Sequence, residues 1–455
     1  MSWVDAVWPL IVAAALVILP GAFVGYYLGL RRVALLSLSP VFSISVLACT
    51  AVVISPFHIR WGLIPVLIAT LLSGLLAWIT RRIVTRRWPN AFAPAPPAER
   101  ALTRYSIAGV AVAAVAIGWR LMATIGVPSN ISQTYDAVFH LSAIRYILNS
   151  GVATTLAISG LPVTGLERAG FYPAGWHDLT SLVVMITGAS IPVGVSAVTV
   201  VIGALVWPLS LLLFVRVVSG RRRLPLVVAG VISVGFAAFP YLMMDYGVVY
   251  AFLLGLALIP AVWSLAVTAL GYAHEPPISR PASIVALLVA LPGISIAHPS
   301  ATMAVVMLCA PLLLLIVIAW HRRLRAAGAK PGRYVALYAG ALILVGVVLA
   351  LFYKIQPGNF WKPQSTWLQA VIDLVGDSPV GLGPAVIISL LTTTGLVVSI
   401  LRRRNLWLVL SWVMVSILFI VAAASNSNII RAALIGMWYG DVYRMAALLA
   451  IVEAP

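Results

Sequence analysis

Hydrophobic runs of 18 or more residues recur along this 455-residue chain, and they constrain its fold more than any other feature. A helix of about 20 apolar residues crosses the ~30 Å hydrocarbon core of a bilayer. Lipid-exposed backbone must satisfy its own hydrogen bonds, so spanning segments are either helices or strands of a closed barrel. These runs lack the alternation that barrel strands show. The sequence therefore predicts an all-α polytopic membrane protein.

The composition excludes a soluble globular enzyme. Only 9% of the residues are charged and 62% are hydrophobic, whereas about a quarter of a soluble domain is charged. A folded soluble chain of this size could not cover its surface with so few charges. The two cysteines, Cys49 and Cys309, both lie in apolar runs and indicate neither a disulfide framework nor a metal site.

Twelve apolar segments are long enough to be read as transmembrane helices. The predicted spans are 6–30, 33–57, 62–80, 107–127, 191–218, 224–243, 248–272, 281–297, 301–320, 335–353, 380–400 and 405–424. The run Met445–Val452 begins a thirteenth.

The net charge of +18 is distributed unevenly between the two sides of this arrangement. One side carries 21 basic residues, all but one of them Arg, against the two acidic residues Glu99 and Glu275. The opposite side carries seven basic and eight acidic residues. By the positive-inside rule the basic side is cytoplasmic, and the N-terminus and the long polar loops are external. The basicity therefore indicates topology in the cell membrane and predicts no nucleic-acid partner.

The loops also suggest an organisation into parts. We expect residues 1–80 to form an N-terminal three-helix membrane unit and 81–106 to form a cytoplasmic linker rich in Pro and Arg. Residues 107–455 form the transmembrane core. Its main external loops are 128–179, 354–379 and 425–444.

The first external loop holds the candidate catalytic residues. Asp136 to Asn149 has the pattern of an amphipathic helix, which can lie in the membrane interface. In such a helix Asp136 and His140 are one turn apart and can face the same site. They could act as a general base with its orienting partner, or as two metal ligands. Alternatively, Asp136 is the N-cap and His140 a surface residue, and the spacing alone favours this second interpretation.

Further polar and aromatic residues in the external segments are candidates for substrate binding. They are Arg168, Trp176, His177, His298, Lys354, Trp361, Lys362, Arg431, Trp438, Asp441 and Arg444. Several have simpler interpretations. His298 could be an ordinary helix-end residue, the loop around Trp361 an interfacial anchor, and Asp441 could pair with Arg444.

The candidate residues also carry a family resemblance. Tyr135-Asp136 with His140, the Phe171–His177 stretch and the Trp438-Tyr439-Gly440-Asp441…Arg444 motif resemble the GT-C superfamily of integral-membrane glycosyltransferases. The likeness extends from about Arg104 to Pro455 and is strongest to an actinobacterial branch near the cell-wall arabinofuranosyl- and mannosyltransferases. In that superfamily, an acidic residue near the start of the first large external loop is followed by interfacial helices.

The resemblance implies a transferase in cell wall biogenesis with a GT-C-like core. Its donor would be a polyprenyl-phosphate-linked sugar, arabinofuranose or mannose, and its acceptor an envelope glycan or lipid on the external face. This sequence lacks the Asp-x-Asp or paired-acid motif of metal-dependent members, which leaves open whether a divalent cation takes part.

The resemblance also implies roles for individual residues. Asp136 would be the general base, and His140 or His177 would orient the base or the acceptor. A cation would stabilise the departing phosphate, and aromatic rings would stack on sugars. The candidate cations are Lys354, Lys362, Arg431 and Arg444, and the candidate rings are Trp176, Trp361 and Trp438.

Two other classes of function remain open. A transporter or flippase for a lipid-linked envelope precursor is one, because Pro208, Pro260 and Pro292 interrupt predicted spans. A non-catalytic scaffold in envelope assembly is the other.

Overall fold

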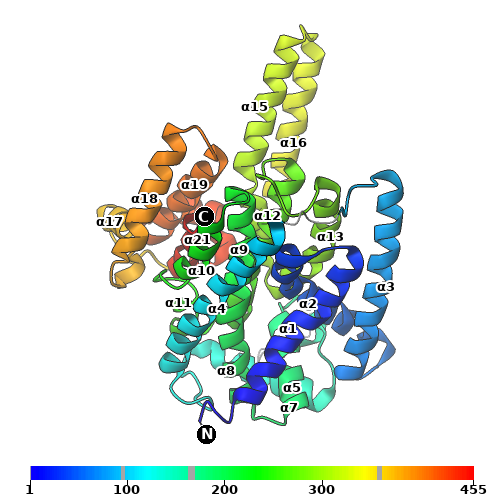
Figure 1. Cartoon of the computed structure of the whole chain (residues 1–455). Coiled ribbons are helices and arrows are strands. Elements are labelled where there is room, and N and C mark those ends of the chain that lie inside the picture. The colour runs from blue at the N-terminus through cyan, green and yellow to red at the C-terminus, as the bar shows by residue number, and fades with distance from the viewer. Residues whose placement is uncertain (1, 94–97, 162–169, 356–360) are drawn as a thin grey trace. The chain divides into compact units, whose positions relative to one another are not determined.

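A computed structural model of the chain describes residues 2–93, 98–161, 170–355 and 361–455. Within these ranges every regular element is a helix (Figure 1). The chain forms two compact units. Unit 1 comprises Met1–Thr302 with Ala454–Pro455, and unit 2 comprises Met303–Glu453.

Ten helices in the described ranges are long and apolar enough to cross a membrane, or eleven if one bent pair is a single span. The first seven are α1 (Val7–Leu28), α2 (Arg32–Ile54) with η1 (Ser55–Phe57), α3 (Leu63–Arg87), α4 (Ala98–Ile125), the continuous α8 (Ile191–Val201), η2 (Ile202–Val206) and α9 (Trp207–Ser219), α12 (Tyr250–Leu270) and α13 (Arg280–Ala297). The remaining three are α14 (Pro299–Leu308) with α15 (Ala310–Ala326), α16 (Pro331–Ile355) and α19 (Leu406–Ala424). The bent pair joins α20 (Asn428–Ile435) and η4 (Gly436–Trp438) to α21 (Val442–Glu453) at 62°. The predicted all-α polytopic class is confirmed, with fewer described spans than the twelve or thirteen expected.

The other helices are shorter than a span. They are α5 (Tyr135–Ser150), α6 (Thr155–Ile158), α7 (Gly175–Thr187), α10 (Arg223–Ile232), α11 (Leu242–Asp245), α17 (Trp367–Gly376), η3 (Pro379–Gly381) and α18 (Val386–Leu401). The predicted span 380–400 corresponds to α18, which has 16 residues. Its start is later than predicted because Pro384 cannot donate the backbone hydrogen bond to the carbonyl of residue 380 that a helix starting there would need.

The predicted span 224–243 is interrupted. α10 ends at Ile232, and Pro240 stands before the next short helix. Side chains satisfy two carbonyls in the break: the indole of Trp207 donates to the Ser233 carbonyl and the hydroxyl of Tyr241 to the Val234 carbonyl, each at 3.1 Å. Irregular backbone at membrane depth requires such buried partners.

The interrupted segment still carries the chain from one end of unit 1 to the other. The His274 N–H, just after α12, donates to the carbonyl of Val217 near the end of α9, at 2.8 Å. α9 and α12 therefore finish at the same end, and residues between them must return the chain to the opposite end.

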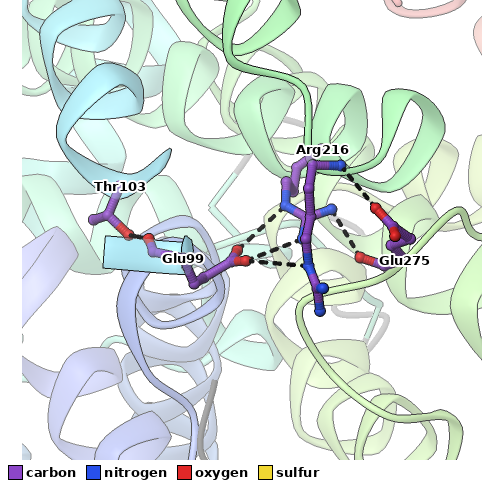
Figure 2. A network of polar contacts seen from close by, with 5 residues as sticks. Glu99, Thr103, Arg216 and Glu275 are labelled. Carbon is purple, nitrogen blue, oxygen red and sulfur yellow. Dashed lines mark hydrogen bonds and ion pairs between the residues drawn. The ribbon is translucent and has the colours of Figure 1, made fainter. Parts of the chain in front are cut away.

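A buried ion pair marks the end of unit 1 where α9 and α12 finish. The Arg216 guanidinium donates to both carboxylate oxygens of Glu99, at 3.2 and 3.1 Å, and to the Glu275 carbonyl at 2.8 Å (Figure 2). The Ser279 hydroxyl donates to the Ala91 carbonyl at 2.6 Å. Loops that bear Arg clusters and lie far apart in the sequence thus meet here, and we call this end the arginine end.

The opposite end of unit 1 collects the N-terminus and the loops rich in aromatic residues. The Trp3 indole donates to the Gly126 carbonyl at 2.7 Å. The Trp61 N–H donates to the Gly151 carbonyl at 2.8 Å, and its indole to the Ser181 hydroxyl at 3.0 Å. Figure 1 shows α5 and α7 at the same end as the N-terminus. We call this the aromatic end.

The first three helices are integrated into unit 1, whereas the sequence predicted a separate unit 1–80 and a linker 81–106. The Ser45 hydroxyl of α2 donates to the Val289 carbonyl of α13 at 2.7 Å and accepts the Gly293 N–H at 2.9 Å. A side chain at Gly293 would collide with the backbone of Val41. Much of the predicted linker is helical, because α3 runs to Arg87 and α4 begins at Ala98.

Candidate functional site

Helix α5 places Asp136 at the aromatic end of unit 1. The N-cap position belongs to Thr134, so Asp136 is in the first turn of the helix and does not cap it. The Asp136 side chain is exposed, while Ala137 and Ile144 of the same helix are buried. A carboxylate in this position is favoured by the partial positive charge of the helix N-terminus.

His140, one turn further along α5, is buried and contacts a second histidine. Its Nδ1 lies 2.9 Å from Nε2 of His177 on α7, and the two residues are 3% and 0% exposed. Burial lowers the pKa of His140 to about 3. Burial, and then the neighbouring His140 ring, lower the pKa of His177 well below its ordinary value. Both rings are therefore neutral near pH 7, and one N–H of the pair is shared across this contact.

Aromatic rings enclose the histidine pair. Trp176 stacks on Tyr250 with ring centroids 4.6 Å apart and planes 8° apart, and the His140 ring lies 5.4 Å from Trp176. Tyr172 lies 5.5 Å from His177. Trp176 is 0% exposed, so in this structure its face packs on Tyr250 and is not open to a sugar ring. The cluster fixes α5 against α7 and the start of α12.

Asp178 follows this cluster in the first turn of α7. It is 1% exposed, and within the described residues neither carboxylate oxygen has a hydrogen-bond donor. Burial raises the pKa of Asp178 well above its ordinary value, so that the neutral acid is favoured.

His298 is the helix-end residue that its simpler interpretation predicts. It caps the C-terminus of α13 at the break before α14, and it is 7% exposed. Its Nδ1 accepts the Ser300 N–H at 3.2 Å, and its ring lies 5.0 Å from Phe252.

The outer face of α5 borders an open depression of about 740 Å³. Arg145 and Tyr146 line it together with Ile191 and Pro192 at the start of α8. Arg145 is nine residues after Asp136, a spacing that places the two on opposite faces of the helix. The depression and the Asp136 carboxylate are therefore separate features.

In unit 2, the Arg431 guanidinium binds backbone carbonyls. It is 1% exposed, and its guanidinium donates to the carbonyls of Ala422, Trp361 and Gly440 at 2.6, 2.7 and 2.7 Å. Longer bonds reach two more carbonyls nearby. The guanidinium is thus occupied in joining α19, residue 361 and the turn after η4, and the predicted role for Arg431 in phosphate binding does not fit this geometry.

Asp441 and Arg444 pair with each other, as the simpler alternative expected. Arg444 Nε lies 3.2 Å from Asp441 Oδ2, and Asp441 is 1% exposed. The Arg444 guanidinium also lies 4.4 Å from the Tyr439 ring. Trp438 is 0% exposed, which places its ring in the core of unit 2 and out of reach of a sugar.

Lys354, Trp361 and Lys362 are exposed, with 44% of the Trp361 side chain accessible. They remain candidates for contact with a lipid headgroup or a sugar. Arg168 lies outside the described residues.

The structure thus divides the predicted site residues between the two units. Unit 1 brings His140, Trp176 and His177 into one cluster, with Asp136 exposed one turn away from it on α5. Tyr250 completes this cluster. No local pattern predicted that partner, because Tyr250 is 74 residues from Trp176 and lies near the start of a predicted span.

Comparison with known proteins places the chain in a family. Residues 14–455 match the model of a family of unknown function, DUF6541. The chain belongs to this family. No curated protein and no solved structure matches it. The match covers almost the whole chain, so the DUF6541 family model includes both units.

Proposed function

We propose that this DUF6541 protein is a membrane glycosyltransferase that uses a polyprenyl-phosphate-linked sugar donor. The observation that supports this most is the exposed carboxylate of Asp136 at the start of α5, a helix too short to span the membrane. Catalytic groups must be held in a fixed position by a rigid element whose other side chains are packed, and α5 meets this requirement for Asp136.

In the proposed reaction, Asp136 accepts the proton of an acceptor hydroxyl as that oxygen attacks the anomeric carbon of the donor. The new glycosidic C–O bond forms while the bond from the anomeric carbon to the phosphate oxygen breaks. The polyprenyl phosphate leaves with the bonding electron pair. A cation beside the phosphate would stabilise its charge.

The histidine pair has a positioning role in this scheme. His140 and His177 are buried away from an acceptor, and their lowered pKa values make them weak bases, so the scheme does not use them to take the acceptor proton. Their contact fixes α5 against α7 and thereby the position of Asp136.

We further propose that the arginine end of unit 1 faces the cytoplasm and the aromatic end faces outward. The packing of unit 1 supports this, because loops carrying Arg31, Arg81 and Arg216–Arg223 gather at one end: a Cβ on Gly29 would lie 3.0 Å from Arg81. Basic loops are retained on the cytoplasmic side. An external site also suits a lipid-linked donor, which reaches that side within the membrane.

Transport of a lipid-linked precursor is the second candidate. It is favoured by interrupted helices: the π-helical turn η2, the break after α10 and the 62° bend before α21. Broken spans at membrane depth are common in transporters.

One experiment separates the two candidates. The purified protein is reconstituted in liposomes with polyprenyl-phosphate arabinofuranose or mannose and a mixture of oligosaccharide acceptors, and the products are analysed by mass spectrometry. A transferase yields an acceptor enlarged by one sugar and free polyprenyl phosphate. If intact donor moves between leaflets and no new glycosidic bond forms, the transferase proposal is wrong and the protein is a transporter.

A further inference from the structure

Unit 2 contains a partly open pocket with several polar side chains that the proposed reaction does not use. Its volume is about 360 Å³, within the range of small-molecule sites. It lies among α17, α19 and the start of α21, helices that pack together in unit 2 (Figure 1). Its polar lining consists of Gln364, Ser365, Gln369, Asp373 and Tyr443.

Asp373 is the central acceptor of this pocket. It is 7% exposed, and its Oδ1 accepts the Gln369 side-chain amide at 2.6 Å. In the described part of the chain no donor reaches its second carboxylate oxygen, which is therefore available to a ligand. Water can reach this oxygen, and a ligand hydroxyl that replaces the water would form a charge-assisted hydrogen bond with the carboxylate.

The remaining lining supplies mixed donors and acceptors over an apolar floor. The side chain of Gln364 hydrogen-bonds the Tyr443 hydroxyl, and the amide groups of Gln364 and Gln369 can each donate and accept. Phe419 and Ala423 of α19 form part of the floor.

This combination selects one chemical class of ligand. Neighbouring hydroxyls of a sugar each donate and accept, as a carboxylate flanked by amides and a phenol requires. A phosphate would be repelled by Asp373, and an ammonium ion, which only donates, could bind the carboxylate but could accept nothing from the amides. We propose that this pocket binds the hydroxyl groups of a neutral carbohydrate. The identification of that carbohydrate as the acceptor rests on the proposed function, whereas binding itself does not.

The test measures binding in the absence of any donor. The full-length protein is placed in lipid nanodiscs, since a maltoside detergent would compete. Saturation-transfer NMR is then recorded with methyl α-D-mannopyranoside and methyl α-D-arabinofuranoside, and separately with choline and with methyl phosphate, whose methyl protons report binding of a phosphate group. We expect transfer to at least one glycoside and none to choline or phosphate. Binding of choline or phosphate without either glycoside would overturn the proposal.

Variants test whether the glycoside seen by NMR binds in this pocket. Asp373→Asn keeps the shape and can still accept from Gln369, but it removes the charge, and we expect affinity for the glycoside to fall about tenfold or more. Ala423→Leu fills the floor and leaves every polar group in place, so it should also weaken binding. Tyr443→Phe should weaken binding, while the matched Tyr338→Phe on α16 should not. Unchanged affinity in both Asp373→Asn and Ala423→Leu would refute the site, whether or not the protein transfers sugar.

Discussion

Replacing Glu99 with glutamine should destabilise unit 1 strongly, because it leaves the Arg216 guanidinium buried beside a neutral partner. Arg216 is 0% exposed and Glu99 2%, and two hydrogen bonds of 3.1 and 3.2 Å join them. Removing one partner of a buried pair costs about 3–5 kcal/mol. Arg216 keeps its bond to the Glu275 carbonyl, so we expect the lower part of that range, about 3 kcal/mol.

The same network provides the control. Glu275 is exposed, and its carboxylate accepts the Arg221 N–H at 3.3 Å. Glu275→Gln should therefore cost about 1 kcal/mol or less. The free energy of unfolding is measured for both variants in mixed micelles by tryptophan fluorescence.

A double variant sharpens the argument. Glu99→Leu with Arg216→Met removes both charges and should recover most of the stability that Glu99→Gln loses. Equal losses for Glu99→Gln and Glu275→Gln would refute the reasoning that burial sets the cost.

Three further predictions follow from the structure. In a cysteine-free background, Gln133→Cys should react with an impermeant maleimide on intact cells and Arg222→Cys only after permeabilisation; the reverse pattern would invert the topology. Burial raises the pKa of Asp178, so its contribution to stability is lost as pH rises above 3.8 and through the folded-state pKa. Asp178→Asn should therefore stabilise the protein at pH 8 and have little effect at pH 4 in thermal unfolding; a benefit at pH 4 alone would contradict this. Arg431→Lys should destabilise unit 2 by about 3 kcal/mol or more, because one ammonium group cannot donate to all the carbonyls that the guanidinium binds. A measured free energy of unfolding equal to that of the wild type would contradict this structural role.

Local patterns predicted a large part of the fold. The length and hydrophobicity of each apolar run identified the spans, because both are properties of a single segment and do not depend on its partners. The amphipathic pattern from Asp136 to Asn149 predicted a helix, and α5 covers Tyr135–Ser150. The sequence predicted an unbroken span at 224–243. Hydropathy measures only how apolar a segment is, so it could not predict that Trp207 and Tyr241 donate hydrogen bonds to backbone carbonyls in the break.

Pairing between distant residues was beyond the sequence. His140 and His177 are 37 residues apart, and Glu99 and Arg216 are 117 apart. No local periodicity specifies such partners. Composition also cannot distinguish an exposed cation from a buried one, which is why Arg431 was read as a ligand for phosphate although its guanidinium binds backbone carbonyls.

The rate of sugar transfer by Asp136→Asn tests the central claim most directly. The comparison is with wild type and with Asp5→Asn, a matched change at an exposed aspartate that accepts from Ser2 near the N-terminus. Loss of a general base lowers rates by about 10²–10⁴-fold, so we expect a fall of at least about 100-fold for Asp136→Asn and none for Asp5→Asn. A folded Asp136→Asn protein that transfers sugar at the wild-type rate would contradict the assignment of the base.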